Sequence, residues 1–417
     1  MSRIEKTVFI CYRRTNAAWA LLIYKALRSE GYDVFIDYTG IASGAFETVI
    51  TENIQSRAHF LVLLTPSSLE NASMSSKDWM RFETQVALDC KRNVVPVTLE
   101  GFKFDEPSLT DKITGEFAQL KHYNALSVPD DISYFDFAMS RLRDDFLNVE
   151  LDAVSHPPSP ELTEIVTSSQ TAADNAPDVT PEELTAQKWF ERGFAANNPK
   201  DKIQYYSEAI RLDPEDAFAH FNRGHAHAEL GDQAASIKDY DEAIRLSPED
   251  ADAYINRGAL HYGLGDQAAA IKDYDEAIQL NPEDADAYFN RGTSHSKLGD
   301  RAAAIKDYDE AIRLNPEHAK AHFNRGLSHA KLGDRTAAIK DYDEAIQLNP
   351  EYAKAYINRG NSHAALGDRA AAIKDYDEAI RLNPEYTKAY NNRGQLHKLL
   401  GNLKASESDF KKADDLN

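Results

Sequence analysis

The chain has few cysteines and no long apolar run, and both absences limit what it can be. Only two cysteines, Cys11 and Cys90, occur in 417 residues, so a disulfide-bonded secreted scaffold is excluded and a reducing, cytoplasmic compartment is expected. The densest apolar run, Phe60 to Leu64, is far shorter than the roughly 18 residues of a membrane helix. The N-terminus enters a predicted strand without the apolar region of a signal peptide, so we expect no membrane partner.

Positive charge is also scarce. Residues 1–150 hold 16 basic and 21 acidic side chains, which leaves most of the formal net charge of −21 in the rest of the chain. Phosphate backbones and anionic lipids would be repelled by this acidic C-terminal part. We therefore expect no nucleic acid partner, whereas a basic protein partner would be attracted.

The second half of the chain repeats itself every 34 residues. Glycines and prolines that keep this spacing are Gly224, Gly258, Gly292, Gly326, Gly360, Gly394, Pro214, Pro248, Pro282, Pro316, Pro350 and Pro384. Each period predicts two helices, the second with an apolar face such as Ile237, Tyr240 and Ile244. In the Leu-Gly-Asp turn between them, Gly ends one helix and Asp caps the next. This period predicts a solenoid of stacked helix pairs.

Small residues where helices must approach closely make this array resemble the tetratricopeptide repeat (TPR) family. About seven repeats occupy residues 181–417, the first degenerate and the last ending polar, as a capping repeat does. A histidine recurs in each clear repeat, beginning with His227. Because residues one repeat apart cannot converge on one ion, we interpret these histidines as packing and expect no metal site. The resemblance implies an unidentified protein or peptide ligand.

Residues 151–180 separate this array from the first 150 residues. Proline, serine, threonine and acidic residues dominate from Ser155 onward, Lys and Arg are absent, and no apolar period is present. Such a segment has too little apolar surface to order its backbone. We therefore expect a disordered linker that tethers the first domain without fixing it.

Residues 1–150 alternate strands and helices. Strands are predicted at Thr7–Tyr12, Asp33–Ile36, His59–Leu64, Asn93–Thr98 and, weakly, near Tyr123–Leu126. Helices are predicted at 16–29, 46–54, 77–90 and 132–147. This alternation predicts an α/β domain with a doubly wound parallel sheet.

Three segments of this domain carry sequence motifs that are best interpreted together. They read VFICYRR at 8–14, GYDVFID at 31–37, followed by a loop with Gly40 and Gly44, and KDWMRFE at 77–83. Together they resemble the TIR domain family, and within it the members that cleave NAD⁺. The resemblance implies a flavodoxin-like sheet of five parallel strands in the order 2-1-3-4-5.

A carboxylate and an aromatic ring are predicted to face the open edge of this sheet. Trp79 and Glu83 stand four residues apart on one helix, so they share a face. In doubly wound sheets the ligand crevice lies outside the carboxyl ends of the strands. The N-glycosidic bond of NAD⁺ breaks through an oxocarbenium-like state that one carboxylate can stabilise. Nicotinamide leaves as a neutral pyridine and needs no second acid, so Glu83 is the predicted catalytic carboxylate.

Further residues at this edge are predicted substrate contacts. They follow the first strand, lie in or after the loop that follows the second strand, or precede Glu83 on its helix: Tyr12, Arg13, Arg14, Ser43, Gly44, Phe46 and Trp79. The aromatic rings would stack on the ligand or form its wall, the arginines would neutralise the diphosphate, and the loop would close over it.

Each of these assignments has a plainer alternative. On spacing alone, Glu83 would be an ordinary exposed helix residue, and Trp79 would be part of a buried wall. The two arginines would be solvated or lie at an interface, Phe46 would belong to the core and Gly44 to a turn. Cys11 lies in a strand without a partner for nucleophilic chemistry, so we interpret it as packing.

The sequence therefore predicts an NAD⁺ nucleosidase that releases nicotinamide and forms ADP-ribose, or a cyclic form if the adenine of the substrate attacks. No cofactor is expected beyond NAD⁺ as substrate. The resemblance implies catalysis by self-associated TIR domains, with the repeats controlling assembly, in defence or cell-death signalling. The alternative is a non-enzymatic scaffold that signals through TIR contacts, and a third possibility is an enzyme that is inactive as a monomer.

Overall fold

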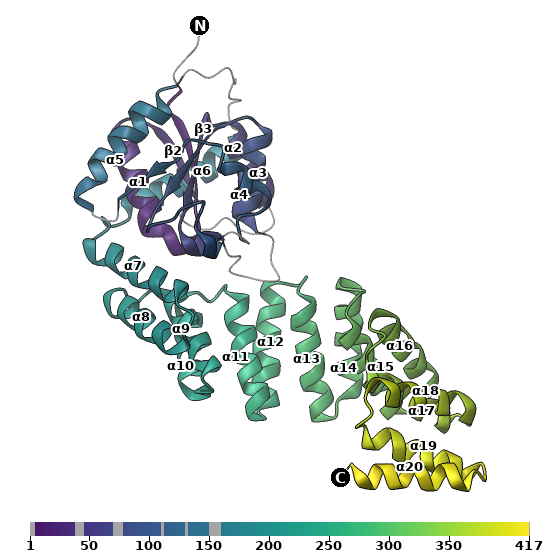
Figure 1. The fold of residues 1–417 in the computed structure, drawn as a ribbon. Coiled ribbons are helices and arrows are strands. Elements are labelled where there is room, and N and C mark those ends of the chain that lie inside the picture. Colours follow the sequence, from purple (N-terminus) through teal and green to yellow (C-terminus); the bar gives the residue numbers. More distant parts are fainter. Residues whose placement is uncertain are drawn as a thin grey trace. The chain divides into compact units, whose positions relative to one another are not determined.

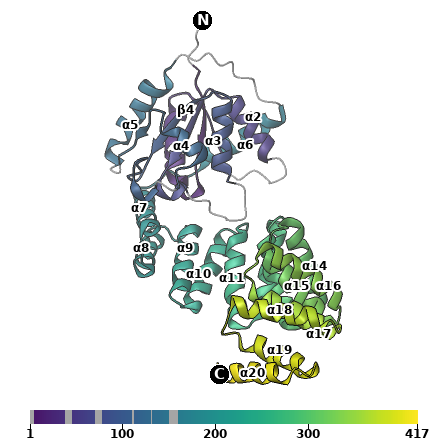
Figure 2. The same ribbon diagram turned by 45° about the vertical axis from the view of Figure 1, so that its right-hand side comes forward.

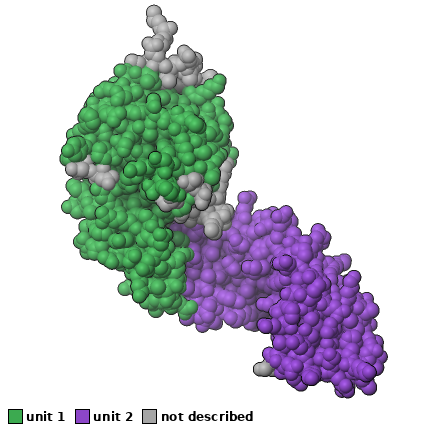
Figure 3. Space-filling model, in the orientation of Figure 1, with its two compact units in different colours: residues 1–247 green, residues 248–417 purple. Residues whose placement is uncertain are grey.

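The structure, a computed structural model, describes residues 5–37, 46–69, 78–109, 112–129, 132–149 and 160–416. It contains two compact units, residues 1–247 and residues 248–417 (Figure 3). The first unit holds a β-sheet with its helices and two further helix pairs. The second unit is built from helices. None of the described helices is both long and apolar enough to cross a membrane.

Five short strands form the sheet of the first unit (Figure 1). They are β1 (Thr7–Cys11), β2 (Asp33–Ile36), β3 (His59–Leu64), β4 (Asn93–Thr98) and β5 (Leu126–Ser127). All pairings are parallel and the order is β2-β1-β3-β4-β5, so the expected flavodoxin-like order is confirmed. Strand β3 is buried along its whole length, as a central strand covered on both faces must be.

Helices cover both faces of this sheet (Figure 2). They are α1 (Ala17–Ser29) and α5 (Phe135–Arg141) on one face, and α2 (Phe46–Gln55), α3 (Trp79–Asp89) and α4 (Gly115–Leu120) on the other. Side chains alternate along β1, with Val8 and Ile10 in the first core and Phe9 and Cys11 in the second. Cys11 therefore lies on the face of the sheet that α3 covers.

Short helical segments join these elements. They are the 3-10 helices η1 (Arg14–Asn16), η2 (Pro66–Leu69), η3 (Pro107–Leu109) and η4 (Ile132–Tyr134) and the π-helical η5 (Leu142–Leu147). The helix expected over residues 132–147 is thus η4, α5 and η5 in succession. The helix expected from residue 77 begins at Trp79, because Asp78 caps it.

The segment that we expected to be a disordered linker contains a helix. Helix α6 spans Pro160–Asn175, so the prediction of disorder is wrong for these residues, and 151–159 lie outside the described part. Helix α6 packs against the edge strand β2. Its Val166 and Ala173 are buried in the cores on the two faces of the sheet. These tertiary contacts stabilise a helix that the segment's composition does not predict.

Side chains of α6 also cover the outer edge of β2. The hydroxyl of Ser169 donates to the carbonyl oxygen of Ile36 at 2.7 Å. The amide nitrogen of Gln170 donates to the carbonyl oxygen of Val34, also at 2.7 Å. In a parallel edge strand these alternate carbonyls point away from the sheet, so α6 satisfies acceptors that no strand reaches.

The first helix of the array, α7 (Pro181–Ala195), is fixed to the sheet domain. It contacts α1 and η2, and its Leu184 is buried in the core that α1 and α5 share with the sheet. The expectation that the array is joined only by a loose tether is therefore wrong at this end of the array. Sheet, α6 and α7 belong to one compact unit.

The described residues from 181 to 416 form seven helix pairs. Those of the first unit are α7 with α8 (Pro199–Leu212) and α9 (Ala217–Glu229) with α10 (Gln233–Leu246). Those of the second unit are α11 (Ala251–Leu264) with α12 (Gln267–Leu280), α13 (Ala285–Leu298) with α14 (Arg301–Leu314), α15 (Ala319–Leu332) with α16 (Arg335–Leu348), α17 (Ala353–Ala365) with α18 (Arg369–Leu382) and α19 (Thr387–Leu399) with α20 (Leu403–Asp415).

Close contacts explain the recurring glycines of the second unit. A Cβ on Gly292 would lie 2.9 Å from a ring carbon of Tyr308, so α13 and α14 approach too closely for a larger residue. An arginine then links successive repeats. Arg291 lies 2.6 Å from Asp307 in its own repeat and 2.7 Å from Asp275 in the preceding one. His295 flanks the same Asp307 at 3.9 Å.

Candidate active site

The candidate site begins where β1 and β2 end. In the observed strand order the switch point lies between β1 and β3, and the crevice of such sheets opens at their carboxyl ends. Tyr12, which follows β1, donates its hydroxyl to the carbonyl oxygen of Asp37, which follows β2, at 2.8 Å. This hydrogen bond connects the ends of the two strands, and the phenol hydroxyl of Tyr12 is its donor.

Arg13 connects β1 to two further elements. Its Nε donates to the carbonyl oxygen of Ser68 in η2 at 3.1 Å, and its Nη2 lies 2.8 Å from the carboxylate of Asp78. The guanidinium is thus held inside the domain, and the predicted diphosphate contact of Arg13 stays a prediction. Arg14 begins η1 and its side chain is exposed.

Asp78 places the helix that carries Glu83. Its side chain accepts a hydrogen bond from the backbone nitrogen of Arg81 and so caps the N-terminus of α3. Arg81 also lies 3.2 Å from the Asp78 carboxylate and donates to the carbonyl oxygens of Lys112 and Thr114. The start of α3 is therefore fixed on one side by Arg13 and on the other by the segment before α4.

Glu83 is buried on α3, with 8% of its surface exposed. Burial raises the pKa of its carboxyl to about 8. A hydrogen bond from Cys11 and the charge of Arg13 lower that pKa, whereas the charges of Asp37 and Asp78 raise it. The plainer alternative of an exposed helix glutamate is therefore wrong. A buried carboxyl with a strongly shifted pKa, beside the last residue of β1, is typical of functional sites.

Cys11 has the partner that we did not expect from the sequence. Its thiol lies within hydrogen-bonding reach of Glu83, and it also reaches the carbonyl oxygen of Met80 at 3.9 Å. Burial, and next the nearby Glu83, raise the pKa of Cys11 well above its ordinary value. The thiol therefore stays protonated, which makes it a hydrogen-bond donor beside Glu83 and not a nucleophile.

Trp79 stands at the first position of α3, one turn before Glu83, and is partly exposed. Its ring meets that of Phe82 edge to face, with centroids 5.6 Å apart. Ser43 and Gly44 lie outside the described residues, and Phe46 is the first residue of α2.

The structure thus brings Tyr12, Arg13 and Glu83 together through partners that we did not predict. These partners are Cys11, Asp37, Ser68 and Asp78. For Asp78 a sequence signal existed, since Asp directly before a helical run is a typical N-cap. The other contacts join segments far apart in the chain and leave no local pattern.

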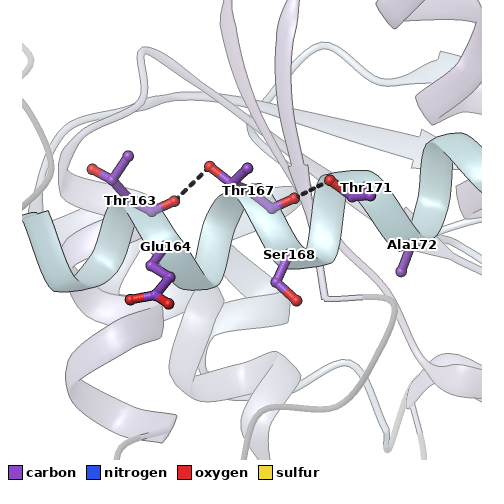
Figure 4. A pocket seen from close by; sticks show the side chains of 6 residues that line it. All are labelled: Thr163, Glu164, Thr167, Ser168, Thr171 and Ala172. Carbon is purple, nitrogen blue, oxygen red and sulfur yellow. Dashed lines mark hydrogen bonds between the residues drawn. The ribbon is translucent and has the colours of Figure 1, made fainter.

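A pocket lies on the surface of α6, away from the candidate site. An open pocket runs along the polar face of α6 and is lined by Thr163, Glu164, Thr167, Ser168, Thr171 and Ala172 (Figure 4). The hydroxyls of Thr167 and Thr171 donate to the backbone of their own helix, and none of the predicted site residues lines the pocket. Across the described part of the chain, no group of three or more His, Cys, Asp or Glu side chains is placed to hold a metal ion.

Comparison with known families covers both parts of the chain. A family described as "TIR domain" matches residues 8–137. Families described as "TPR repeat" or "Tetratricopeptide repeat" match 203–231, 225–265, 261–299, 289–353, 353–386 and 387–417. The chain carries a TIR domain followed by tetratricopeptide repeats.

Curated relatives match the TIR domain. One, named NAD(+) hydrolase tir-1, from Caenorhabditis elegans, is 33% identical over 32% of this chain and 14% of its own length. Another, NAD(+) hydrolase SARM1 from Danio rerio, is 34% identical over 24% of this chain and 14% of its own length. The chain therefore spans about a seventh of these relatives.

Solved structures match the TPR array. A protein described as YrrB, "a TPR protein with an unusual peptide-binding site", is 24% identical over 44% of this chain and 95% of its own, with a TM-score of 0.40. A tetratricopeptide repeat protein from Parabacteroides merdae is 19% identical over 56% of this chain and 93% of its own, with a TM-score of 0.45.

Proposed function

We propose that the TIR domain hydrolyses the nicotinamide–ribose bond of NAD⁺, with Glu83 as the catalytic carboxylate. The observation that carries this proposal is a buried carboxyl at the switch point of the sheet, with a pKa of about 8. The similarity of the TIR domain to relatives named NAD(+) hydrolases supports the same reaction.

The reaction needs one carboxylate and water. The electron pair of the bond between C1′ and nitrogen passes to the nicotinamide ring, which leaves as a neutral molecule. The ribose is left with positive charge near C1′, which the Glu83 carboxylate would stabilise. Water then adds to C1′ and gives up a proton to Glu83 or to solvent, which completes ADP-ribose. If a nitrogen of the substrate's adenine adds instead, the product is cyclic.

The raised pKa of Glu83 fits a cationic substrate. At neutral pH the buried carboxyl is largely protonated in the free protein, since its pKa is about 8. The positive nicotinamide ring of NAD⁺ would favour the ionised form, because opposite charges attract strongly in a desolvated site. Substrate binding and the loss of the Glu83 proton would therefore be coupled.

The other predicted substrate contacts remain part of this proposal. Trp79, partly exposed on the same helix, offers an aromatic face for nicotinamide or adenine. Arg14 is exposed beside the end of β1 and is our candidate for the diphosphate. Ser43, Gly44 and Phe46 remain proposed contacts from the loop after β2.

Control by the repeats is the second part of this proposal. We propose that the TPR array binds a protein or peptide, that TIR domains act in association, and that the chain works in the cytoplasm in a defence or cell-death response. The buried contact of α7 with the TIR domain supports the coupling of array and TIR domain, because a change in the array can reach the domain directly.

Release of nicotinamide from NAD⁺ by the purified chain, at increasing protein concentration, tests this function. Glu83→Gln should abolish turnover, since the neutral amide cannot stabilise the ribose cation. Asp89→Asn is the matched control, because Asp89 is an exposed carboxylate on the same helix, and it should leave turnover unchanged. Equal turnover by Glu83→Gln would overturn the assignment of Glu83 as the catalytic carboxylate. No turnover by the concentrated or crowded wild type would favour the scaffold alternative.

A further inference from the structure

The first helices of the last three repeats carry no carboxylate, although most of the negative net charge of the chain lies outside residues 1–150. Helices α15, α17 and α19 contain lysine, arginine and histidine but neither Asp nor Glu. The first helices of the two preceding repeats, α11 and α13, hold Asp252 and Asp286 in their first turns. The charge in the first turn of these helices therefore changes sign between α13 and α15.

Lysine replaces aspartate at one fixed position of the repeat. Lys320, Lys354 and Lys388 stand 34 residues apart, each is the second residue of its helix, and all three are exposed. Asp252 and Asp286 occupy the same position in α11 and α13. An acid in the first turn stabilises a helix and a lysine there weakens it, because the helix N-terminus carries partial positive charge. The stability of their own helices therefore does not explain the three lysines.

The arginines of these helices are neutralised inside the array, whereas the lysines are not. Arg359 lies 2.6 Å from Asp375 in its own repeat and 2.5 Å from Asp343 in the preceding one. The equivalent arginines of α15 and α19 form the same two pairs. Within the described part of the chain, no carboxylate forms an ion pair with Lys354 or Lys388. Their charge is therefore available to a ligand.

The lysines belong to a continuous surface. Helices α13, α15, α17 and α19 follow one another in contact (Figure 1). Asn361 and Asn392 lie seven and four residues after the lysines of α17 and α19, on the same face of each helix, and the Asn392 amide donates to the Asn361 side-chain oxygen at 2.8 Å. A hydrogen bond from His318 and, after it, the charge of Lys320 lower the pKa of Asp286. The same faces of successive helices therefore lie within reach of one another.

We propose that this face of α15, α17 and α19, which we call the lysine face, binds an extended acidic segment of a partner protein. Three exposed lysines on helices without a carboxylate attract Asp and Glu and repel a basic segment. The net charge of the array favours a basic partner, but a ligand responds to charges within about one Debye length, roughly 8 Å at physiological salt. The inference names the partner chemistry for the proposed control by the repeats, on which it rests.

The repeat also sets the spacing of the acidic residues in the partner. Packed helices lie about 8–10 Å apart, and an extended chain advances about 3.3 Å per residue. One repeat therefore corresponds to about three residues of the ligand, and an acid at every third position would meet the three lysines in turn. Asp286 in the next repeat would repel a longer acidic stretch, so the acidic part of the ligand ends there.

Fluorescence anisotropy of a labelled peptide tests this inference on the full chain. The peptide has nine residues, with Glu at every third position and Gly or Ser elsewhere, and the salt concentration is about 0.1 M. Reversal of the lysine face in one triple variant should weaken binding at least about tenfold. Its substitutions are Lys320→Glu, Lys354→Glu and Lys388→Glu. The variant should fold, because Glu is favoured in the first turn of a helix, and circular dichroism checks this.

A second triple variant is the matched control. It reverses three lysines that are exposed on the second helices α14, α16 and α18 and changes the net charge equally: Lys306→Glu, Lys340→Glu and Lys374→Glu. Binding should stay within about twofold of the wild type, since these lysines lie on other helices. Equal weakening by both triple variants overturns the lysine face. Absence of binding by the wild type, or tighter binding of a peptide with Lys in place of Glu, also overturns it.

Two further probes test the class of ligand. A peptide with its three glutamates adjacent should bind more weakly than the spaced one, and equal binding overturns the arrangement of one acid per repeat. A single-stranded oligonucleotide of equal charge should bind more weakly than the spaced peptide. Tighter binding of the oligonucleotide, lost on reversal of the lysine face, overturns the protein partner in favour of nucleic acid.

Nicotinamide release from NAD⁺ separates this inference from the proposed function. Peptide binding that is lost on reversal of the lysine face supports the inference even if no nicotinamide is released, a result that contradicts only the proposed cleavage. Nicotinamide release by a wild type that binds no peptide contradicts only the acidic partner.

Discussion

The guanidinium of Arg13 lies 2.8 Å from the carboxylate of Asp78, and this pair joins the end of β1 to the start of α3. Both side chains are 14% exposed, so the pair is shielded from solvent and is worth more than a surface salt bridge. Asp78 also caps α3. The Asp78 carboxylate therefore both pairs with Arg13 and caps α3, and substitutions can separate these two roles.

Asp78→Asn should keep the cap and lose the charge, because Asn is as good an N-cap as Asp. Arg13 is then left partly buried without its anion, and we expect a loss of about 1–3 kcal/mol in the unfolding free energy. Asp78→Ala should cost about 1 kcal/mol more through loss of the cap. Tryptophan fluorescence in urea measures this, because all three tryptophans lie in the first unit. Since α3 positions Glu83, kcat for NAD⁺ cleavage should fall in both variants by a larger factor than KM rises. Wild-type kinetics for Asp78→Asn would contradict the role of the Arg13–Asp78 pair in positioning Glu83.

Glu83 should make the first unit less stable as pH rises. Its pKa is about 8 in the folded chain against an ordinary 4.5. Between these values the carboxyl is protonated when folded and ionised when unfolded, so its contribution is complete below about 4.5 and is lost as pH rises to about 8. Glu83→Gln lacks this loss, so its unfolding free energy relative to wild type should rise by up to about 5 kcal/mol across that window. Urea unfolding at pH 5 and pH 8.5 measures it, and a constant difference would refute the raised pKa.

Cys11 should set the pH at which NAD⁺ cleavage begins. If the ionised Glu83 is the active form, kcat/KM rises with pH toward a plateau above about 8. Cys11→Ala removes a donor to the carboxylate and should move the rise to higher pH. Cys11→Ser supplies a stronger donor and should move it to lower pH. Cys90→Ala, which changes the other thiol, is the control, and identical profiles for all four proteins would exclude the thiol from the site.

Arg325 should stabilise two repeats at once. It lies 2.6 Å from Asp341 in its own repeat and 2.6 Å from Asp309 in the preceding one. Arg325→Ala leaves the buried Asp341 uncompensated, and we expect a loss of about 3 kcal/mol. Circular dichroism in urea follows this loss, since the second unit has no tryptophan. Arg313→Ala, which breaks an exposed pair with Glu310, should change nothing measurable; equal losses for both variants would contradict the role of burial.

The fold was predictable where the signal is local and repeated. The parallel sheet follows from apolar strands that alternate with helices, and the helix pairs follow from glycine and proline at fixed spacing. The strand order β2-β1-β3-β4-β5 was expected only from the resemblance to the TIR family. Helix α6 was not predictable, because its residues are polar and its stability comes from contacts with distant groups. Tyr24, for example, donates to Asp174, and Ser169 donates to Ile36.

The candidate site was predictable only in part for the same reason. Glu83 and Trp79 stand one helical turn apart, so the sequence alone places them on one face. The hydrogen bond that lowers the pKa of Glu83 comes from Cys11, which lies on another element more than 70 residues away in the chain. The sequence therefore predicts the chemistry of the carboxyl but neither its surroundings nor its pKa.

Helix α6 also affects how the TIR domain can be studied by itself. A fragment that ends with η5 at Leu147 would keep all five strands and the Glu83 carboxyl, but it would lose Ser169 and Gln170. Its β2 edge would be open in solution, so such a fragment should tend to aggregate or polymerise. Activity measured on that fragment would describe the sheet domain without α6, whereas a fragment reaching to the end of α10 would keep the contacts of α6 and α7 with the sheet domain.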